Sequence, residues 1–285
     1  MNTKIITWNE ERGFEADELA EAAQIIRDGG LVAFPTETVY GLGGNGLDPQ
    51  ASQKIYAAKG RPSDNPLILH IAKIDQLHEV VSEIPEAAAT LAEAFWPGPL
   101  TMIFKKTDCV PYETTGGLDT VAVRMPQHMG ALQFLEEAGV PVAAPSANTS
   151  GRPSPTLAKH VKEDLDGKID MIIDGGEVGI GFESTIVDVT EEIPVILRPG
   201  FITQKMLQEI VGEVQMDPAL MQVSGDQKPK APGMKYRHYA PKADLKIVEG
   251  PMEQVISYIN EQAEKGRTGI ICTEETRSRY PKGDI

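Results

Sequence analysis

The residues best suited to chemistry lie in the stretch from residue 30 to residue 72. Residues 31–34 form a short apolar run that predicts a strand buried on both faces. Thr36, Glu37 and Thr38 then place polar groups at the end of that strand. Because open α/β sheets bind their ligands at the ends of strands, these side chains indicate a binding site.

Three further groups follow in the same stretch. Lys59 and Arg61 place two cations on a predicted loop, and His70 is the polar residue of an apolar strand predicted over residues 67–72. A run of glycines between the two strands predicts a turn at which backbone N–H groups come close to a ligand: Gly41, Gly43, Gly44 and Gly46. Together these groups indicate a site for an anion beside a small polar molecule.

Each group also has a purely structural interpretation. The glycine spacing matches neither the dinucleotide fingerprint nor the P-loop, and such a run is commonly an ordinary turn. A pair of cations on a loop is normally solvated surface, and a single histidine in an apolar strand is more often a hydrogen-bonded core residue. The crowding of all these groups into one short stretch favours the functional interpretation.

A second candidate lies on the strand predicted over residues 119–125. Side chains alternate between the faces of a strand, so Thr120, Ala122 and Arg124 share one face. A small residue between a hydroxyl and a guanidinium is typical of a strand that faces a ligand. Arg124 taken alone is equally explained as a charge on an edge strand.

A third candidate is the run VPVAAPSAN at residues 140–148. If this run stays extended, Ala144, Ser146 and Asn148 project to one side, where their short side chains leave room for a planar group or a phosphate. The Ser-rich and Asn-rich continuation is equally typical of an ordinary turn.

The remaining periodicities predict an α/β fold. Strands are expected at residues 100–104, 170–174, 186–189 and 193–197, the last two forming a hairpin, and helices at residues 16–28, 74–82, 85–95, 127–138, 155–165 and 204–211. Strands outnumber what simple βαβ alternation would give. We therefore expect a twisted, open sheet that mixes parallel and antiparallel strands.

The chain is expected to divide into three parts. Residues 1–211 are expected to form the main domain, which carries the candidate site residues, and residues 212–243 a linker that is rich in Pro, Gly and Lys. The motif KYRHYAP within that linker is too aromatic for a spacer and predicts a lid over the site. Residues 244–285 are expected to form a small βαβ unit, with strands at 245–248 and 268–272, that begins a second domain.

Charge and composition restrict the class of protein. The net charge of −15 disfavours non-specific binding to nucleic acid, so local cations are expected to serve a pocket. Cys109 and Cys272 match no zinc or redox pattern, which disfavours a structural metal cluster or a disulfide framework. We find no apolar run long enough to span a membrane and no signal-peptide pattern, so the expected location is the cytoplasm.

These motifs taken together resemble the YrdC-type L-threonylcarbamoyladenylate synthases in their two-domain form. The resemblance covers roughly residues 20–243 and is carried by FPTETVYGLG, KGRPSDNPLILHI, WPGPLT, LDTVAVRMP, APSANTSGRPSPT, FESTIVD, LRPG and APGMKYRHYAP. It implies a YrdC-like fold with a concave pocket. It also implies a nucleotidyltransferase that joins L-threonine, bicarbonate and ATP into threonylcarbamoyl-AMP and pyrophosphate, which supplies the t6A modification of tRNA.

The resemblance also implies roles for individual residues. The positions that match the family's threonine pocket are Thr38, His70, Arg124, Ala144 and Ser184. Those that match or accompany its ATP site are Lys59, Arg61, Asn65, Thr120, Ser146, Asn148, Ser154, Arg198 and His238. The catalytic group is not identified by the motifs; His70 and Arg61 are the candidates.

Mg²⁺ on the ATP phosphates is the expected cofactor, with no metal ligands from the protein itself. The expected partners are the three substrates and, functionally, the t6A transferase proteins, without stable tRNA binding or membrane association. Three alternatives remain: an RNA-binding module, a carbamoyladenylate-forming maturation enzyme, and a regulatory binder that lacks catalysis.

Overall fold

The computed structural model describes residues 2–220 and 243–281, and the chain divides into two compact units, residues 1–240 and 241–285. The KYRHYAP motif and His238, expected to form a lid, lie outside the described residues. Residues 214–216 were expected in the linker, but they belong to the core and the sheet of the first unit. Val214 is buried there, and the strand formed by residues 215–216 pairs with the preceding strand.

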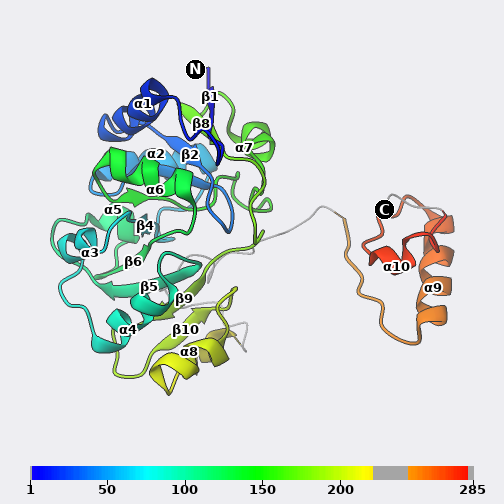
Figure 1. The fold of residues 1–285 in the computed structure, drawn as a ribbon. Helices are drawn as coiled ribbons and strands as arrows, with labels where there is room; N and C mark the ends of the chain where they lie inside the picture. The colour runs from blue at the N-terminus through cyan, green and yellow to red at the C-terminus, as the bar shows by residue number, and fades with distance from the viewer. Residues whose placement is uncertain (1, 221–242, 282–285) are drawn as a thin grey trace. The chain divides into compact units, whose positions relative to one another are not determined.

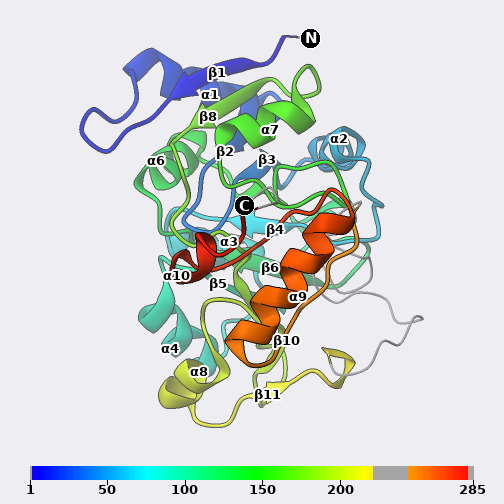
Figure 2. The same cartoon turned by 90° about the vertical axis from the view of Figure 1, so that its right-hand side faces the viewer.

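The first unit is built on one mixed sheet whose strand order is β1-β8-β2-β3-β7-β4-β6-β5-β9-β10-β11. Figure 2 shows these strands following one another from β1 at one edge to β11 at the other. The pairs β1–β8, β2–β8, β4–β6 and β5–β9 are parallel, while β2–β3, β3–β7, β5–β6 and β9–β10 are antiparallel. The predicted mixed α/β sheet is therefore confirmed.

The strands are short and mostly buried. Their bounds are β1 Lys4–Thr7, β2 Val32–Phe34, β3 Gly41–Asn45, β4 Ile68–His70, β5 Leu100–Lys105, β6 Thr120–Arg124, β7 Val142–Ala143, β8 Met171–Asp174, β9 Thr185–Asp188, β10 Val195–Arg198 and β11 Gln215–Met216. The helices of this unit are α1 Ala16–Arg27, α2 Pro49–Lys59, α3 Asp75–Val80, α4 Glu86–Phe95, α5 Tyr112–Thr115, α6 Met129–Ala138, α7 Ala158–Leu165 and α8 Gln204–Val211. All the helices expected in this unit are present; α8 has the predicted bounds, and the others have shifted ends.

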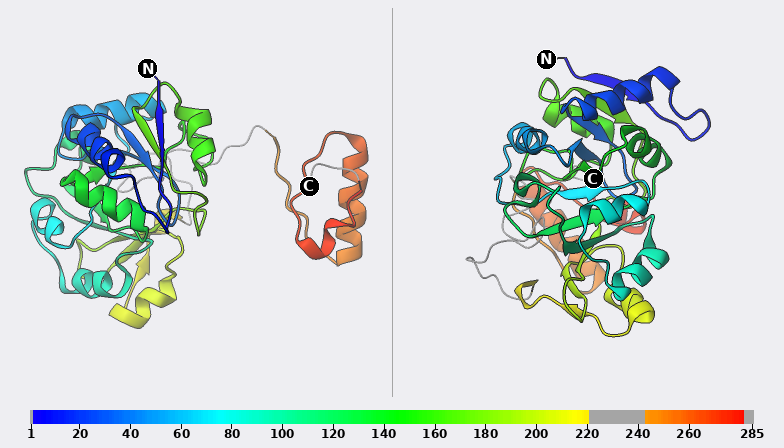
Figure 3. Two further views of the ribbon diagram at one scale, coloured as in Figure 1. Left: turned by 45° about the horizontal axis from the view of Figure 1, so that its top comes forward. Right: turned by 90° about the vertical axis from the view of Figure 1, so that its left-hand side faces the viewer.

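Helices cover the two faces of the sheet unequally. On one face, α1 and α6 lie side by side over β1, β8 and β2, as Figures 1 and 3 show, and their apolar side chains pack with Val32 and Phe34. On the other face, side chains of α2, α4, α7 and α8 join a larger core that contains Leu69 and Val123. Beyond α1 and α6, on the first face, the strands β4, β6 and β9 present only a small apolar group that includes Ile68 and Ala122.

The glycine run is a strand and not the turn that its composition predicts. Gly41–Asn45 forms β3, antiparallel to both β2 and β7. A Cβ atom added at Gly43 would lie 2.8 Å from Val142, and one at Gly46 would lie 2.3 Å from Leu69. These glycines let neighbouring side chains of the sheet come close, which is a packing requirement that composition alone does not distinguish from a turn.

The second unit contains the expected helix, α9 Met252–Lys265, and a short helix, α10 Glu274–Arg277. Its small core contains Ile256, Ile270 and Tyr280. Residues 245–248 and 268–272 are not strands in the described structure, so that prediction is wrong. Leu245 and Ile271, expected to be strand residues, are 73% and 92% exposed, because no neighbouring strand covers them within residues 243–281.

Within residues 2–220 and 243–281, the helices are all too short or too polar to cross a lipid bilayer.

Candidate active site

A cavity of about 150 Å³ lies on the face of the sheet where β4, β6 and β9 extend beyond α1 and α6. Two of its polar side chains, His70 and Arg124, are register partners on β4 and β6. They therefore point to the same face of the sheet, which is the face that carries the cavity. Segments from seven parts of the chain meet there. The described residues that line the cavity are Thr36, Thr38, Val39, Gly41, Arg61, Ile68, His70, Arg124, Ala144, Pro145, Ser146, Glu183, Ser184 and Arg198.

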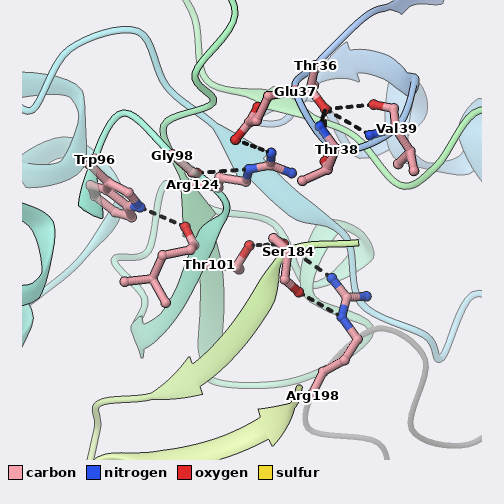
Figure 4. A network of polar contacts seen from close by, with 11 residues as sticks. Thr36, Glu37, Thr38, Val39, Trp96, Gly98, Thr101, Arg124, Ser184 and Arg198 are labelled. Atoms are coloured by element: carbon pink, nitrogen blue, oxygen red, sulfur yellow. Dashed lines mark hydrogen bonds and ion pairs between the residues drawn. The ribbon is translucent and has the colours of Figure 1, made fainter. Parts of the chain in front are cut away.

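Arg124 is the buried cation at one end of this cavity, with 4% of its surface exposed. Its Nη2 atom lies 2.7 Å from Oε1 of Glu37, and its Nε atom donates to the carbonyl of Gly98 at 3.4 Å (Figure 4). Gly98 belongs to a tight corner after α4, where the indole of Trp96 donates to the carbonyl of Leu100 at 2.7 Å. Arg124 is therefore held from two sides, in a position suited to bind a carboxylate.

His70 is a neutral residue of the same wall. Burial, together with the positive charge of Arg124, lowers the pKa of His70 to about 3. Its Nδ1 atom lies 3.2 Å from the carbonyl of Ile68, and a carbonyl can only accept, so Nδ1 carries the proton and Nε2 is an acceptor. His70 can therefore accept a hydrogen bond from a ligand at Nε2, but this nitrogen does not take up a second ring proton at neutral pH.

Three hydroxyl and guanidinium groups meet at the start of β9. The hydroxyls of Ser184 and Thr101 lie 2.7 Å apart, and Arg198 donates to the carbonyl of Ser184 at 3.1 Å and to its hydroxyl at 3.2 Å. Figure 4 shows Ser184 between Thr101 and Arg198. This network fixes the Ser184 side chain at the wall of the cavity.

Lys59 is buried and is not a solvated loop cation. It ends α2, where Nζ donates to the carbonyl of Ser146 and to that of Asn148, the latter at 2.5 Å. Burial, followed by the charge of Arg61, lowers the pKa of Lys59 well below its usual value. Lys59 thus anchors the segment that carries Ser146 and lies behind the lining of the cavity.

Asn148 departs from the predicted alternation. Its amide nitrogen donates to the carbonyls of Thr149 and Arg152, both at 2.9 Å, and its Oδ1 accepts from the hydroxyl of Ser146 at 2.6 Å. Ala144 and Ser146 line the cavity, whereas the Asn148 side chain closes the turn behind them. The prediction that all three project together is wrong at its third residue, because the chain turns after Ser146.

Arg61 lines the cavity while its guanidinium Nη2 donates to the carbonyls of Asn65 and Pro66, at 3.3 and 3.1 Å. Asn65 is buried, and within the described residues its Oδ1 atom accepts no hydrogen bond. A buried acceptor without a donor is costly, so Asn65 is suited to receive an N–H group of a ligand.

The structure brings together most of the residues predicted for the site. The five positions implied for threonine all line the cavity: Thr38, His70, Arg124, Ala144 and Ser184. Of those implied for ATP, Arg61, Ser146 and Arg198 line it, while Lys59, Asn65, Asn148 and Ser154 are each hydrogen-bonded to a lining residue. Thr120 lies two residues before Ala122 on the same face of β6 but does not line the cavity.

Several lining residues were not predicted. Ile68 lies two positions before His70, so strand alternation places it on the same face. Glu183 directly precedes the predicted position Ser184, and its polarity was the available signal. Thr36, predicted as a polar group at the end of the first strand, does line the cavity. Val39 and Pro145 carry no chemical signal that sequence reasoning could have used. Gly41, which was predicted to bring its backbone close to a ligand, does line the cavity.

Glu183 is the acidic side chain among the described lining residues, and its Oε1 accepts the hydroxyl of Ser154 at 2.5 Å. Within the part of the chain that the structure describes, no three His, Cys, Asp or Glu side chains are grouped to hold a metal ion. Any metal at this cavity would therefore depend on a ligand for most of its coordination.

A larger open groove, about 610 Å³, lies beside α1 and α2. Its polar groups are already engaged, because Lys54 donates to the carbonyl of Gly29 at 2.6 Å and Asp170 accepts the Leu31 N–H at 2.8 Å. The smaller cavity is the better candidate, since of these two hollows only it is lined by buried charged side chains, Arg61 and Arg124.

Known proteins are similar to this chain over nearly its whole length. The Sua5/YciO/YrdC family model, described as "Telomere recombination", matches residues 24–200, and a model described as "Threonylcarbamoyl-AMP synthase, C-terminal domain" matches residues 202–284. A threonylcarbamoyl-AMP synthase of Pyrococcus abyssi is 58% identical over 84% of this chain and 70% of its own length. One from Bacillus subtilis is 49% identical over 98% of this chain and 82% of its own length.

The crystal structure of P. abyssi Sua5 complexed with L-threonine is similar to this one. It has a TM-score of 0.88 and 52% sequence identity, over 94% of this chain and 80% of that chain.

Proposed function

The chain belongs to the Sua5/YciO/YrdC family, and from that premise we propose that it condenses L-threonine, bicarbonate and ATP into threonylcarbamoyl-AMP and pyrophosphate. The observation that carries the proposal is the convergence of Arg124, neutral His70 and Ser184 on one cavity that also contains Arg61 and Arg198. The first group suits an amino acid, and the second suits a polyphosphate.

Arg124 is assigned to the threonine carboxylate, since a guanidinium binds a carboxylate through two parallel hydrogen bonds. Nε2 of His70 and the hydroxyls of Thr38 and Ser184 are placed to bind the remaining polar groups of threonine. A short side chain at Ala144 leaves room for the substrate. The likeness to a solved Sua5 that contains L-threonine supports this assignment.

The nucleotide is assigned to the part of the wall formed by Arg61, Ser146 and Arg198. The guanidinium groups offset the charge of the phosphates, and the Asn65 Oδ1 is suited to accept from an N–H of the base. Lys59, Asn148 and Ser154 act through their hydrogen bonds to lining residues. Thr120 and His238 stay predictions for ATP binding, the first beside the cavity and the second outside the described residues.

The reaction requires little covalent chemistry from the protein. The threonine ammonium group loses a proton, and its nitrogen forms a C–N bond with the carbon of bicarbonate as water leaves. An oxygen of the resulting carbamate attacks the α-phosphorus of ATP, and pyrophosphate leaves with the electron pair of the broken P–O bond. Positioning and charge neutralisation lower the barrier. His70, with a pKa of about 3, orients the nitrogen and does not store its proton.

Mg²⁺ bound to the phosphates fits the residues at the cavity. Mg²⁺ keeps several waters and takes one or two carboxylates beside phosphate oxygens, and Glu183 offers one carboxylate at the wall. When bound, the ion supplies positive charge to the leaving pyrophosphate. We place the reaction in the cytoplasm, with the product passing to the t6A transferase proteins.

The test incubates the full chain with ATP, Mg²⁺, ¹⁴C-bicarbonate and one amino acid at a time. The expected result is a labelled adenylate that forms with L-threonine, with one pyrophosphate released per adenylate. Pyrophosphate release without label in the adenylate, or equal product with L-serine and L-valine, would contradict the proposal. RNA binding without ATP turnover would favour the RNA-binding alternative.

A further inference from the structure

Glu37 is a buried carboxylate that the proposed reaction does not use. Thr36 and Thr38 line the cavity on either side of it, but Glu37 itself lies beside Arg124, outside the lining residues. Its side chain is 11% exposed. Apart from the ion pair with Arg124, neither carboxylate oxygen of Glu37 has a hydrogen-bond donor within the described residues.

The backbone around Glu37 is rigidly held. The hydroxyl of Thr36 accepts the N–H groups of Thr38 and Val39, each at 3.2 Å, and donates to the carbonyl of Val39 at 2.6 Å (Figure 4). The carbonyl of Glu37 accepts the Ile180 N–H at 2.9 Å. This turn therefore directs the Glu37 carboxylate toward the guanidinium and keeps it there.

The charges at this end of the cavity sum to zero. Arg124 contributes one positive charge and Glu37 one negative charge, both buried and 2.7 Å apart. His70 adds none, because burial keeps its ring neutral. His128 also lies within electrostatic reach of Glu37, and burial lowers its pKa, which Glu37 partly opposes. A ligand that enters beside Arg124 thus meets one positive and one negative charge of the same magnitude.

We propose that Glu37 makes this end of the cavity selective for a zwitterionic amino acid over a simple carboxylate anion. The inference rests on the proposed function, because it refines how threonine is recognised. A lone buried arginine would attract any carboxylate, and the field of Glu37 lowers that attraction. The same field favours the ammonium group of an amino acid, so that only a ligand with both charges gains from both residues.

The test compares three ligands by isothermal titration calorimetry with the full chain. These are L-threonine, the anion 2,3-dihydroxybutanoate with the configuration of L-threonine, and the cation L-threoninol. In the Glu37→Gln variant, which keeps the shape of the side chain and removes its charge, we expect the anion to gain about tenfold in affinity relative to threonine. L-threoninol is expected to lose about tenfold relative to threonine. A loss of site geometry would weaken all three ligands together.

Two variants complete the design. Glu37→Asp keeps the charge and is expected to keep the wild-type order of the three ligands, even where overall affinity falls. Glu136→Gln removes a charge that is paired with Lys73 on the surface, at 59% side-chain exposure, and is expected to change nothing. If circular dichroism shows that Glu37→Gln is not folded, the affinities of the wild-type protein test the proposal. The proposal then requires the anion to bind the wild type at least tenfold more weakly than threonine does.

The outcomes separate this inference from the function on which it rests. Threonine binding by the wild type, with the same ligand order in Glu37→Gln, would overturn the inference and leave the function standing. Failure of the wild type to bind L-threonine would overturn both.

Discussion

Arg124 is buried and already paired with Glu37, and yet it is assigned to bind a second anion, the carboxylate of threonine. Glu37 and the carbonyl of Gly98 hold its guanidinium from two sides, so the group needs little reorganisation when a carboxylate arrives. Much of the binding energy for threonine is therefore expected to depend on the planar geometry of this one side chain and not on its charge alone.

Replacing Arg124 by lysine tests that dependence. Lysine keeps the charge beside Glu37 but loses the two-pronged geometry, so we expect the KM for L-threonine to rise about tenfold or more while the KM for ATP stays near its wild-type value. Steady-state kinetics with each substrate varied in turn make the measurement. Arg279→Lys, which alters an exposed arginine that contacts both oxygens of Glu253 in the second unit, is the matched control. An unchanged KM for threonine would remove Arg124 from the carboxylate site.

The lowered pKa of His70 predicts a dependence of stability on pH. The folded protein keeps the ring neutral down to about pH 3, whereas the unfolded chain protonates it near pH 6.5. Between those values the unfolded state binds one more proton, so the free energy of unfolding falls as pH falls, by about 1.4 kcal/mol per pH unit from this group.

His70→Asn is expected to flatten that dependence, because asparagine keeps a donor for the carbonyl of Ile68 and does not titrate. Urea denaturation at pH 7 and pH 5 measures it, and the wild type should lose about 2 kcal/mol more than the variant over that interval. His78→Gln, a change at an exposed histidine of α3, is the control. Equal losses in wild type and variant would show that the His70 ring is not held neutral.

At the level of single residues, the sequence predicts the polar walls of the cavity well because strand alternation and polarity both mark them. His70 and Arg124 follow from these rules. The sequence did not predict that Lys59 is buried, because its partners are backbone carbonyls that lie far along the chain. The role of Glu37 was equally hidden, since its partner Arg124 is brought to it only by the fold.

At the level of elements, most helices and strands follow from periodicity, and the errors have physical causes. β1 and β11 lie at the two edges of the sheet and carry too little apolar pattern to be recognised. The composition of β3 predicts a turn, whereas its glycines make room for side chains of β2, β7 and α2. Residues 245–248 show the opposite error, an apolar run that lacks a partner strand among the described residues.

The connection between β10 and α8 predicts an effect of a single methyl group. A Cβ atom at Gly200 would lie 2.5 Å from the nitrogen of Thr185 and 2.8 Å from the carbonyl oxygen of Glu183. Gly200→Ala must therefore displace the backbone that carries Glu183 and Ser184. We expect a loss of about 1–3 kcal/mol in the free energy of unfolding and weaker threonine binding.

Denaturant titration and calorimetry measure the two effects of Gly200→Ala. Gly266→Ala is the matched control, since a Cβ atom there has no neighbour within 4 Å and the backbone is extended. Equal stability of the two variants would mean that the start of β9 has room that the structure does not show.

At the level of the whole molecule, charge separates the candidate functions. A net charge of −15 repels a polyanion over most of the surface, while two of the cations that line the cavity, Arg61 and Arg124, are buried. We expect RNA to bind with a dissociation constant no tighter than about 10⁻⁶ M at physiological salt. Filter binding of a labelled tRNA between 50 and 200 mM salt makes the measurement, with a basic RNA-binding protein as positive control. Tight binding that falls steeply with salt would contradict the expectation.

The order of strands in the sheet has a consequence for biosynthesis. β8 lies between β1 and β2, so the N-terminal strand finds its neighbour only after residues 171–174 have been made. The cavity needs Arg198 as well. A ribosome adds about 5–20 residues per second. Because Arg198 comes late in the sequence of the first unit, most of that unit has been synthesised before the cavity is complete and a substrate can bind. Threonine and nucleotide therefore cannot guide the folding of the nascent polypeptide. A chain that binds either ligand is one in which β10 has already been synthesised.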